Sequence, residues 1–259
     1  MTEKILSRKD GAIGWLVFNN PERRNAVSLE MWQAIPGVLD GFAADNEVRV
    51  VVLTGAGDKA FVSGADISQF EKQRSTAETV AHYDEVGEKA QTRLKEFDKP
   101  VIAMIRGYCL GAGVNIASVC DLRIASEDAR FGIPAAKMGL GYRAGSMKQL
   151  VDIVGPAFAR EIMITARQFS AAEAKEMGLV HKVVPVPELE KTVREYCEMV
   201  AGNAPLTMRA AKRIIREVGK TTYDVAACKA WVKECFDSED YAEGRTAFME
   251  KRKPVFKGR

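Results

Sequence analysis

The spacing of apolar residues divides the chain into strand-like and helix-like segments. Near the start, residues 5–7 and 14–20 are apolar enough for two short strands, and Pro21 ends the second, so the pattern predicts a hairpin. Ser28 stands where an N-cap is expected, and apolar positions from 31 to 42 recur behind it at helical spacing. We therefore expect a helix after Ser28, with Pro36 and Gly37 as its weak points.

Longer apolar runs alternate with helical patterns through the middle of the chain. Residues 49–57 and 101–105 are continuous apolar runs, which indicate strands covered on both faces, and residues 121–125 and 181–185 are further strand candidates. Helical patterns lie between these strands, at 76–97, 112–119, 146–153 and 156–165. This alternation predicts an α/β fold with parallel crossovers.

Strand candidates end before Pro187. The remaining chain is helical in pattern, at 188–201, 205–218, 222–236 and 239–251. We expect a core domain at 1–187 and a helical C-terminal subdomain at 188–259 that is available for packing on a partner subunit. A length of 259 residues suits one large α/β domain with such an appendage.

Composition argues against several classes of partner. The net charge is +3, from 38 basic and 35 acidic residues, so no strong field holds the protein on nucleic acid or a membrane. Five cysteines without CxxC spacing fit a reduced chain. The N-terminal residues lack the apolar segment of a signal peptide, and no stretch is long enough to cross a bilayer. We expect a soluble, cytoplasmic protein with no resident cofactor or metal.

Two strand-to-helix junctions carry the candidate chemistry. They read AFVSGADI at 60–67 and YCLGAGVN at 108–115. Small residues let the backbone approach a ligand, and the N–H groups at a helix start point outward with the helix dipole behind them. Two such turns facing each other would form an oxyanion hole. Taken alone, each is more typical of an ordinary turn, and a nucleotide-binding domain stays open although the usual phosphate-binding patterns are absent.

These two turns belong to a longer set of motifs. The set continues with FGIPAAKMGLG, SAAEAKEMGLVHKVVP, NAPLTMRAAKRII and the closing FMEKRKPVFKGR. Together, from Trp15 to the C-terminus, they resemble the crotonase superfamily, the enoyl-CoA hydratase/isomerase family. The resemblance implies a crotonase-type spiral of ββα units with a helical C-terminal trimerisation region, commonly assembled as a dimer of trimers. It also implies an acyl-CoA thioester as the ligand.

The resemblance further implies which residues bind that thioester. The backbone N–H groups of Ala65 and Ala112 would hold the thioester carbonyl. The positions implied for CoA binding are Arg24, Asn25, Ala26, Ala65, Asp66, Ile67 and Lys257. Phe248 and Phe256 would cover the ligand, whereas the residues alone favour a solvated basic tail for the C-terminal segment.

The chain departs from the family at the two catalytic positions. The hydratases of the family carry two glutamates there, and this chain has Asn115 and Ala135 instead. Neither side chain exchanges a proton at neutral pH. The other titratable side chains in these motifs are expected to be structural or solvated: Asp66, Asp121, Lys137, His82 and His181.

Tyr142 and Arg143 are the candidate catalytic side chains, in the loop GLGYRAGS. This loop lines the acyl pocket in the family, and decarboxylases acting on methylmalonyl-CoA carry a tyrosine at the corresponding place. A tyrosine hydroxyl can orient a carboxylate, and an arginine can bind one bidentately. The alternative is that both residues only pack the loop or an intersubunit contact.

Three functions therefore stay open. A non-standard lyase, such as a malonyl-type acyl-CoA decarboxylase, ranks slightly first, because loss of CO2 generates an enolate without a general base. An enoyl-CoA hydratase or isomerase with substitute acid–base groups is the first alternative. A non-catalytic CoA-thioester binding protein is the second.

Overall fold

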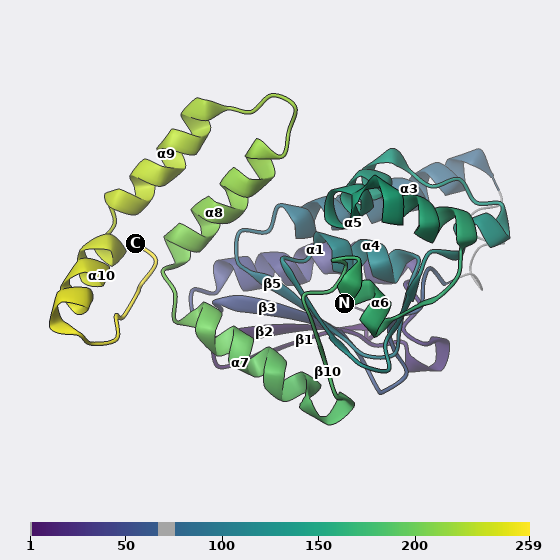
Figure 1. Cartoon of the computed structure of the whole chain (residues 1–259), viewed down its shortest axis with the longest axis horizontal. Coiled ribbons are helices and arrows are strands. Elements are labelled where there is room, and N and C mark those ends of the chain that lie inside the picture. Colours follow the sequence, from purple (N-terminus) through teal and green to yellow (C-terminus); the bar gives the residue numbers. More distant parts are fainter. Residues whose placement is uncertain (1, 67–75) are drawn as a thin grey trace.

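A six-stranded sheet forms the centre of the computed structural model, which describes residues 2–66 and 76–259 (Figure 1). Its strand order is β1-β2-β3-β5-β7-β10. The predicted hairpin is confirmed, with β1 antiparallel to β2, and the later strands pair in parallel. These strands are β1 Ile5–Asp10, β2 Ile13–Phe18, β3 Val50–Gly55, β5 Val101–Ile105, β7 Leu122–Ser126 and β10 Lys182–Val184.

Both faces of this sheet are covered, as the continuous apolar runs predicted. Because side chains alternate between the faces of a strand, Val51 and Leu53 of β3 join the cluster beneath α1, whereas Val50 and Val52 join the cluster beneath α7. The helices of the core are α1 Leu29–Ala44, α3 Ala77–Lys95, α4 Ala112–Val119, α5 Ala144–Thr165, α6 Ala171–Glu176 and α7 Leu189–Ala201.

A second, smaller sheet was missed by the pattern of apolar residues. Among the described residues it has four strands in the order β4-β6-β8-β9, namely β4 Ala60–Val62, β6 Tyr108–Leu110, β8 Arg130–Gly132 and β9 Phe169–Ser170. Segments of two or three residues are too short to show a strand period. Each of β3, β5 and β7 is followed by one of these short strands and then by α3, α4 or α5. The ββα units implied by the family resemblance are therefore confirmed.

Local signals fix several helix boundaries. Ser28 caps α1, its hydroxyl accepting a hydrogen bond from the Met31 amide at 3.4 Å. The predicted break between the helices at 146–153 and 156–165 is a kink within α5, where Gly155 has φ 71° and Pro156 follows. Pro36 is accommodated inside α1, which continues to Ala44. Short 3-10 turns complete the core at η1 Pro21–Arg23, η3 Pro134–Met138 and η4 Val186–Glu188.

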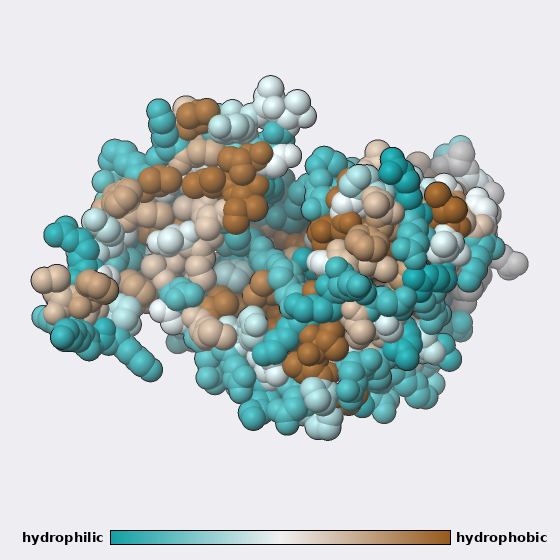
Figure 2. Space-filling view, in the orientation of Figure 1, coloured by the Kyte–Doolittle hydropathy of each residue, from teal (hydrophilic) through white to brown (hydrophobic). Residues whose placement is uncertain are grey.

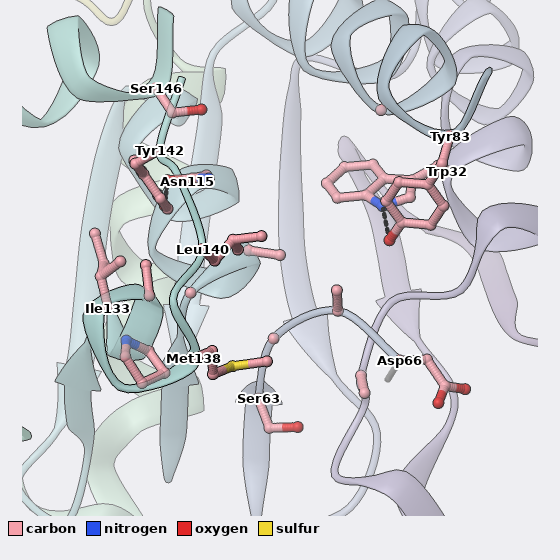
Figure 3. A pocket seen from close by; sticks show the side chains of 18 of the residues that line it. Trp32, Ser63, Asp66, Tyr83, Asn115, Ile133, Met138, Leu140, Tyr142 and Ser146 are labelled. Carbon is pink, nitrogen blue, oxygen red and sulfur yellow. Dashed lines mark hydrogen bonds between the residues drawn. The ribbon is translucent and has the colours of Figure 1, made fainter. Parts of the chain in front are cut away.

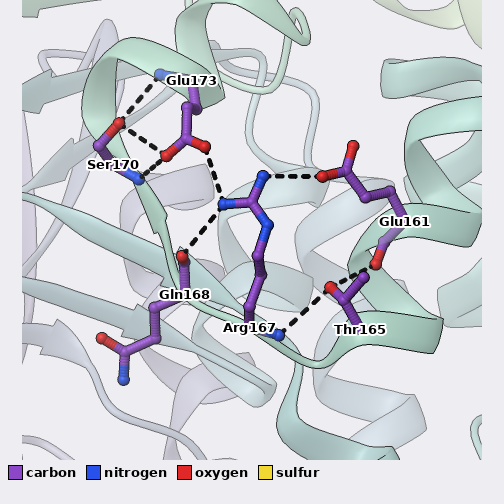
Figure 4. A network of polar contacts seen from close by, with 6 residues as sticks. All are labelled: Glu161, Thr165, Arg167, Gln168, Ser170 and Glu173. Carbon is purple, nitrogen blue, oxygen red and sulfur yellow. Dashed lines mark hydrogen bonds and ion pairs between the residues drawn. The ribbon is translucent and has the colours of Figure 1, made fainter.

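A polar network joins the end of α5 to the short sheet (Figure 4). Arg167 donates to Glu161 at 2.7 Å and to Glu173 at 2.8 Å, and Glu173 also accepts from the Ser170 amide at 2.8 Å. Hydrogen bonds from the Ser170 backbone and from Arg167 lower the pKa of Glu173 to about 2. The network anchors β9, which pairs with β8. The chain continues from β8 into η3.

The last three helices project from the core (Figure 1). They are α8 Pro205–Val218, α9 Val225–Phe236 and α10 Glu239–Glu250. Asp121 joins α8 to the core, because its carboxylate accepts from the Val101 amide at 2.7 Å and from Lys212 at 2.6 Å. Its expected structural role is confirmed. Exposed apolar side chains gather over α8 and α9 (Figure 2).

Assembly and domain division stay predictions. A trimer or dimer of trimers would cover the apolar face of the C-terminal helices, and the proposed boundary at 187/188 falls before α7, which packs on the central sheet. No helix in the described part of the chain is long and apolar enough to cross a bilayer.

Gly113 is required where α4 passes β4. An added Cβ would lie 2.2 Å from the Val62 carbonyl oxygen, an overlap that only a backbone shift relieves. We expect Gly113→Ala to lower the free energy of unfolding by about 1–3 kcal/mol. Gly41→Ala is the matched control, because this α1 glycine has open space around it and should gain up to about 1 kcal/mol of helix stability. Denaturant unfolding of both variants measures the effect, and equal stability of the two would contradict this account.

Candidate active site

One cavity of about 720 Å³ gathers the residues singled out in the sequence (Figure 3). The turns after β4 and β6 form its floor, through Gly64, Ala65, Gly111 and Ala112. Its two walls come from elsewhere in the chain: Trp32 and Tyr83 of α1 and α3 face Ile133, Met138 and Leu140 of the η3 loop. The lining between the ends of the cavity is thus mainly apolar.

The two glycine turns lie next to each other, with room for little more than a methyl group between them. Gly64 has φ 127° and Gly111 has φ 51°, conformations that favour glycine. A Cβ built on Gly111 would lie 3.8 Å from the Gly64 Cα, and one built on Gly64 would lie 3.7 Å from the Leu110 carbonyl oxygen. The two turns are therefore neighbours, as an oxyanion hole made from both would require.

Hydrogen bonding leaves one amide of each turn for a ligand. Val27 bridges the first turn: its N–H donates to the Gly64 carbonyl, and its carbonyl accepts from the Asp66 amide, both at 2.9 Å. The N–H of Ala65, which lies between these two residues, takes no part in this pairing. Ala112 is the first residue of α4, where an N–H has no partner within the helix. No acceptor for either N–H lies among the described residues, and both residues line the cavity.

The positions of the family glutamates both face this cavity. Ala135 is 2% exposed at the start of the η3 loop, and Asn115 lies one turn into α4. The Tyr142 hydroxyl donates to Asn115 Oδ1 at 2.5 Å. Burial raises the pKa of Tyr142 well above its ordinary value, so the hydroxyl stays protonated and acts as a neutral donor. A tyrosine–asparagine pair thus occupies the place of one carboxylate.

Arg143 is already ion-paired. Its guanidinium contacts the Asp84 carboxylate and also donates to the Asp84 backbone carbonyl at 3.4 Å. Asp84 belongs to α3 and Arg143 precedes α5, so the pair spans the cavity between two of its walls. Any substrate group that binds Arg143 has to share it with Asp84.

The positions suggested for CoA binding fall into two groups. Arg24, Ala26, Ala65 and Asp66 line the cavity, and Arg23 accompanies them. Arg24 has φ 50° and its guanidinium lies 5.0 Å above the Tyr108 ring. Asp66 is only 7% exposed. Ile67 lies outside the described residues.

Asn25 and the C-terminal residues do not line the cavity of their own chain. The buried Asn25 side chain accepts from the Asn20 amide and donates to the carbonyls of Ala56 and Ala60, so it supports the turn beside Arg24. The Lys257 amide donates to Asp240 at 2.6 Å, which holds the tail against α10. The cavity lining includes neither Phe248 of α10 nor Phe256 and Lys257 of the tail that follows α10.

The remaining titratable candidates are placed as expected. Lys137 and His82 are exposed and do not line the cavity, and His181 Nδ1 accepts from the Arg123 amide at 3.1 Å. Within the described residues, no three His, Cys, Asp or Glu side chains gather as a metal-binding group.

Sequence reasoning missed the aromatic wall. Trp32 Nε1 donates to the Tyr83 hydroxyl at 3.2 Å, and that hydroxyl donates to the Val27 carbonyl at 3.4 Å, so the wall is tied to the strand segment that supports the Ala65 turn. The helical pattern marked both aromatics as apolar-face residues. Nothing in that pattern tells which of the buried positions borders a cavity.

Comparisons with known proteins agree with this architecture. The family model described as enoyl-CoA hydratase/isomerase matches residues 8–259. The chain is 37% identical to the short-chain-enoyl-CoA hydratase of Clostridium acetobutylicum, over 96% of this chain and 95% of that protein. It is 34% identical to the crotonyl-CoA hydratase of Syntrophomonas wolfei, over 98% of each.

A solved structure gives the same result for the fold. The crystal structure of an enoyl-CoA hydratase/carnithine racemase from Magnetospirillum magneticum superposes with a TM-score of 0.96 at 36% identity, covering 100% of this chain and 97% of that one. The predicted crotonase-type fold is confirmed. The curated relatives named above are hydratases, which agrees better with the hydratase alternative than with the decarboxylase that ranked first on sequence.

The protonated state of Tyr142 can be measured. We expect wild type and Tyr142→Phe to show equal tyrosinate absorbance as pH rises to about 10, because burial keeps the Tyr142 hydroxyl protonated over this range. Since unfolding returns Tyr142 to its ordinary pKa, its contribution to stability is complete below pH 10 and is lost above it. A tyrosinate signal from Tyr142 near neutral pH would contradict this assignment.

Proposed function

Because this chain belongs to the enoyl-CoA hydratase/isomerase family, we propose that it binds an acyl-CoA thioester and stabilises the enolate oxygen with the N–H groups of Ala65 and Ala112. The observation that carries this proposal is the close approach of the two glycine turns, which brings both amides to one cavity without acceptors among the described residues. Such donors are oriented before the charge develops, so they favour the enolate over the neutral thioester.

The cavity also orients the substrate along its length. Ser63 lies at one end of the cavity, and Tyr142 and Ser146 lie at the other (Figure 3). Ser63 donates hydrogen bonds to the backbone carbonyls of Arg23 and Arg24, so these arginines belong to its end, where they can meet the phosphates of CoA. The acyl group then runs between the Trp32–Tyr83 wall and the η3 loop.

The reaction that we propose is hydration or a double-bond shift of an enoyl-CoA. In hydration, water adds to C3 and a proton adds to C2, so a group must accept the water proton and a donor must face C2. The family glutamates are absent, and of the substitutes considered from sequence, Asp66 and Tyr142 line the cavity whereas Lys137 does not. We assign Asp66 the role of the base that takes a proton from the water and then, as the acid, delivers that proton to C2. The neutral Tyr142 hydroxyl, hydrogen-bonded to Asn115, positions the water or the acyl group.

A panel of 2-enoyl-CoA thioesters tests this function. We expect mass spectrometry to show gain of one water, or chromatography to show a moved double bond at unchanged mass. Asp66→Asn should abolish turnover but leave thioester binding within a few-fold, because only the base is lost. Tight binding with no turnover by the wild type would instead support a CoA-thioester binding protein.

Restoring a family glutamate should increase hydration. Ala135 lines the cavity and Ala136 beside it is exposed outside the cavity, so Ala135→Glu and Ala136→Glu form a matched pair. We expect Ala135→Glu to raise the hydration rate by about 10²-fold, the lower range for a positioned acid–base group, and Ala136→Glu to leave it unchanged. Equal rates in both variants, with each melting like the wild type, would show that the oxyanion hole is not aligned for hydration.

Decarboxylation of a 2-carboxyacyl-CoA is the second candidate. The observation in its favour is that neither Asn115 nor Ala135 can exchange a proton, while Tyr142 donates into the same site. The bond between C2 and the carboxylate carbon would break, its electron pair would form the enolate, and C2 would then take a proton from water. Loss of CO2 from the panel, impaired at least about tenfold in Tyr142→Phe, would support this candidate over hydration.

A further inference from the structure

The end of the cavity away from Arg24 is polar rather than apolar. Ser146, Tyr142 and Asn115 lie together there (Figure 3), and Gln91 of α3 also lines the cavity. The Arg143–Asp84 ion pair joins α3 to the start of α5 on the same side. A pocket built for a plain alkyl chain gains nothing from charged and amide groups in its lining, since each loses hydration when the chain arrives.

The two charges of this pair are not equally covered. The side chain of Arg143 is 48% exposed and that of Asp84 is 27% exposed, so the guanidinium is the more accessible partner. A guanidinium carries five N–H donors in a planar fork, and it can hold a second carboxylate beside Asp84. The Asp84 carboxylate keeps the fork oriented before a ligand arrives.

We propose that Arg143 and Asp84 form a recognition site for a carboxylate at the far end of the acyl chain. This inference rests on the proposed function and names its substrate class: acyl-CoA thioesters whose acyl group is a dicarboxylic acid. Arg23 and Arg24 bind the anionic CoA end, Arg143 binds the anionic acyl end, and the apolar walls hold the carbons between them. The site is distinct from the position of a leaving carboxylate on C2, which must lie beside the Ala65 and Ala112 amides.

A cationic acyl end fits less well. It would have to reach Asp84, the more covered partner, past the guanidinium that already neutralises it. A carboxylate instead meets the more exposed partner, and the acidic side chain of the pair, Asp84, has its charge offset by Arg143.

Three thioesters of equal chain length test the inference: 2-enoyl-CoAs that end in a methyl group, a carboxylate or a trimethylammonium group. Their dissociation constants are measured by calorimetry, and turnover is followed in parallel. We expect wild type to bind the carboxylate-ended thioester at least about tenfold more tightly than the methyl-ended one, as a partly buried arginine–carboxylate contact allows.

Two variants with opposite expected effects distinguish carboxylate recognition by the Arg143–Asp84 pair from a purely structural role in which the pair only joins α3 to α5. Arg143→Gln should remove the preference for the carboxylate, whereas Asp84→Asn should increase it several-fold, because a repelling charge is lost and Arg143 keeps its own. Arg93→Gln is the matched control: it breaks another ion pair of α3, with Asp40 at 2.8 Å, away from the cavity, and should change nothing.

The outcomes distinguish this inference from the proposed function. If the methyl-ended or the cationic thioester binds as well as the carboxylate, or if both site variants change all three affinities equally, the inference is wrong and the proposed function stands. If none of the thioesters binds, both are wrong. The predicted opposite shifts in Arg143→Gln and Asp84→Asn would establish the site.

Discussion

The close approach of two glycine turns is the constraint on which the rest of the structure depends. A Cβ on Gly111 would already reach van der Waals contact with Gly64, and Gly113 brings α4 against the carbonyl of Val62 with no room for a side chain. This approach requires β4 and β6 to be neighbours in the short sheet, and thus requires each ββα unit to place one strand in each sheet. The two amides that remain without acceptors in the described chain follow from it.

The rest of the molecule holds these turns in place. Val27 bridges the Ala65 turn, and the Trp32–Tyr83 pair ties the adjoining wall to Val27. On the opposite side, the polar network around Arg167 fixes β9 against β8, from which the η3 loop leaves for the cavity. An oxyanion hole made of backbone needs this support, since a donor that reorganises during the reaction loses its advantage.

Loss of both family glutamates affects the proton transfers that such a site can catalyse more than the way it holds a thioester. The Tyr142–Asn115 hydrogen bond fills one position with a neutral pair, and the small Ala135 leaves apolar space at the other. The proposed enolate stabilisation does not depend on these side chains, because it uses N–H groups that no substitution at positions 115 or 135 removes. Fast proton transfer does not survive unless another group supplies it, which is why Asp66, nearly buried and on the cavity wall, carries the proposed role.

The sequence by itself determined the hairpin, the buried central strands, the main helices and the two glycine turns, because each depends on a local pattern of burial, capping or backbone freedom. Ser28 and the Gly155–Pro156 kink are examples in which a few adjacent residues suffice. Only the tertiary structure decided the short strands β4, β6, β8 and β9, which are formed by pairing between units and have no period of their own. It also decided that Arg143 meets Asp84, 59 residues earlier, and that Lys257 lies on α10 instead of at its own cavity. Contacts between distant segments are set by how the sheets and helices stack, and that information is spread over the whole chain.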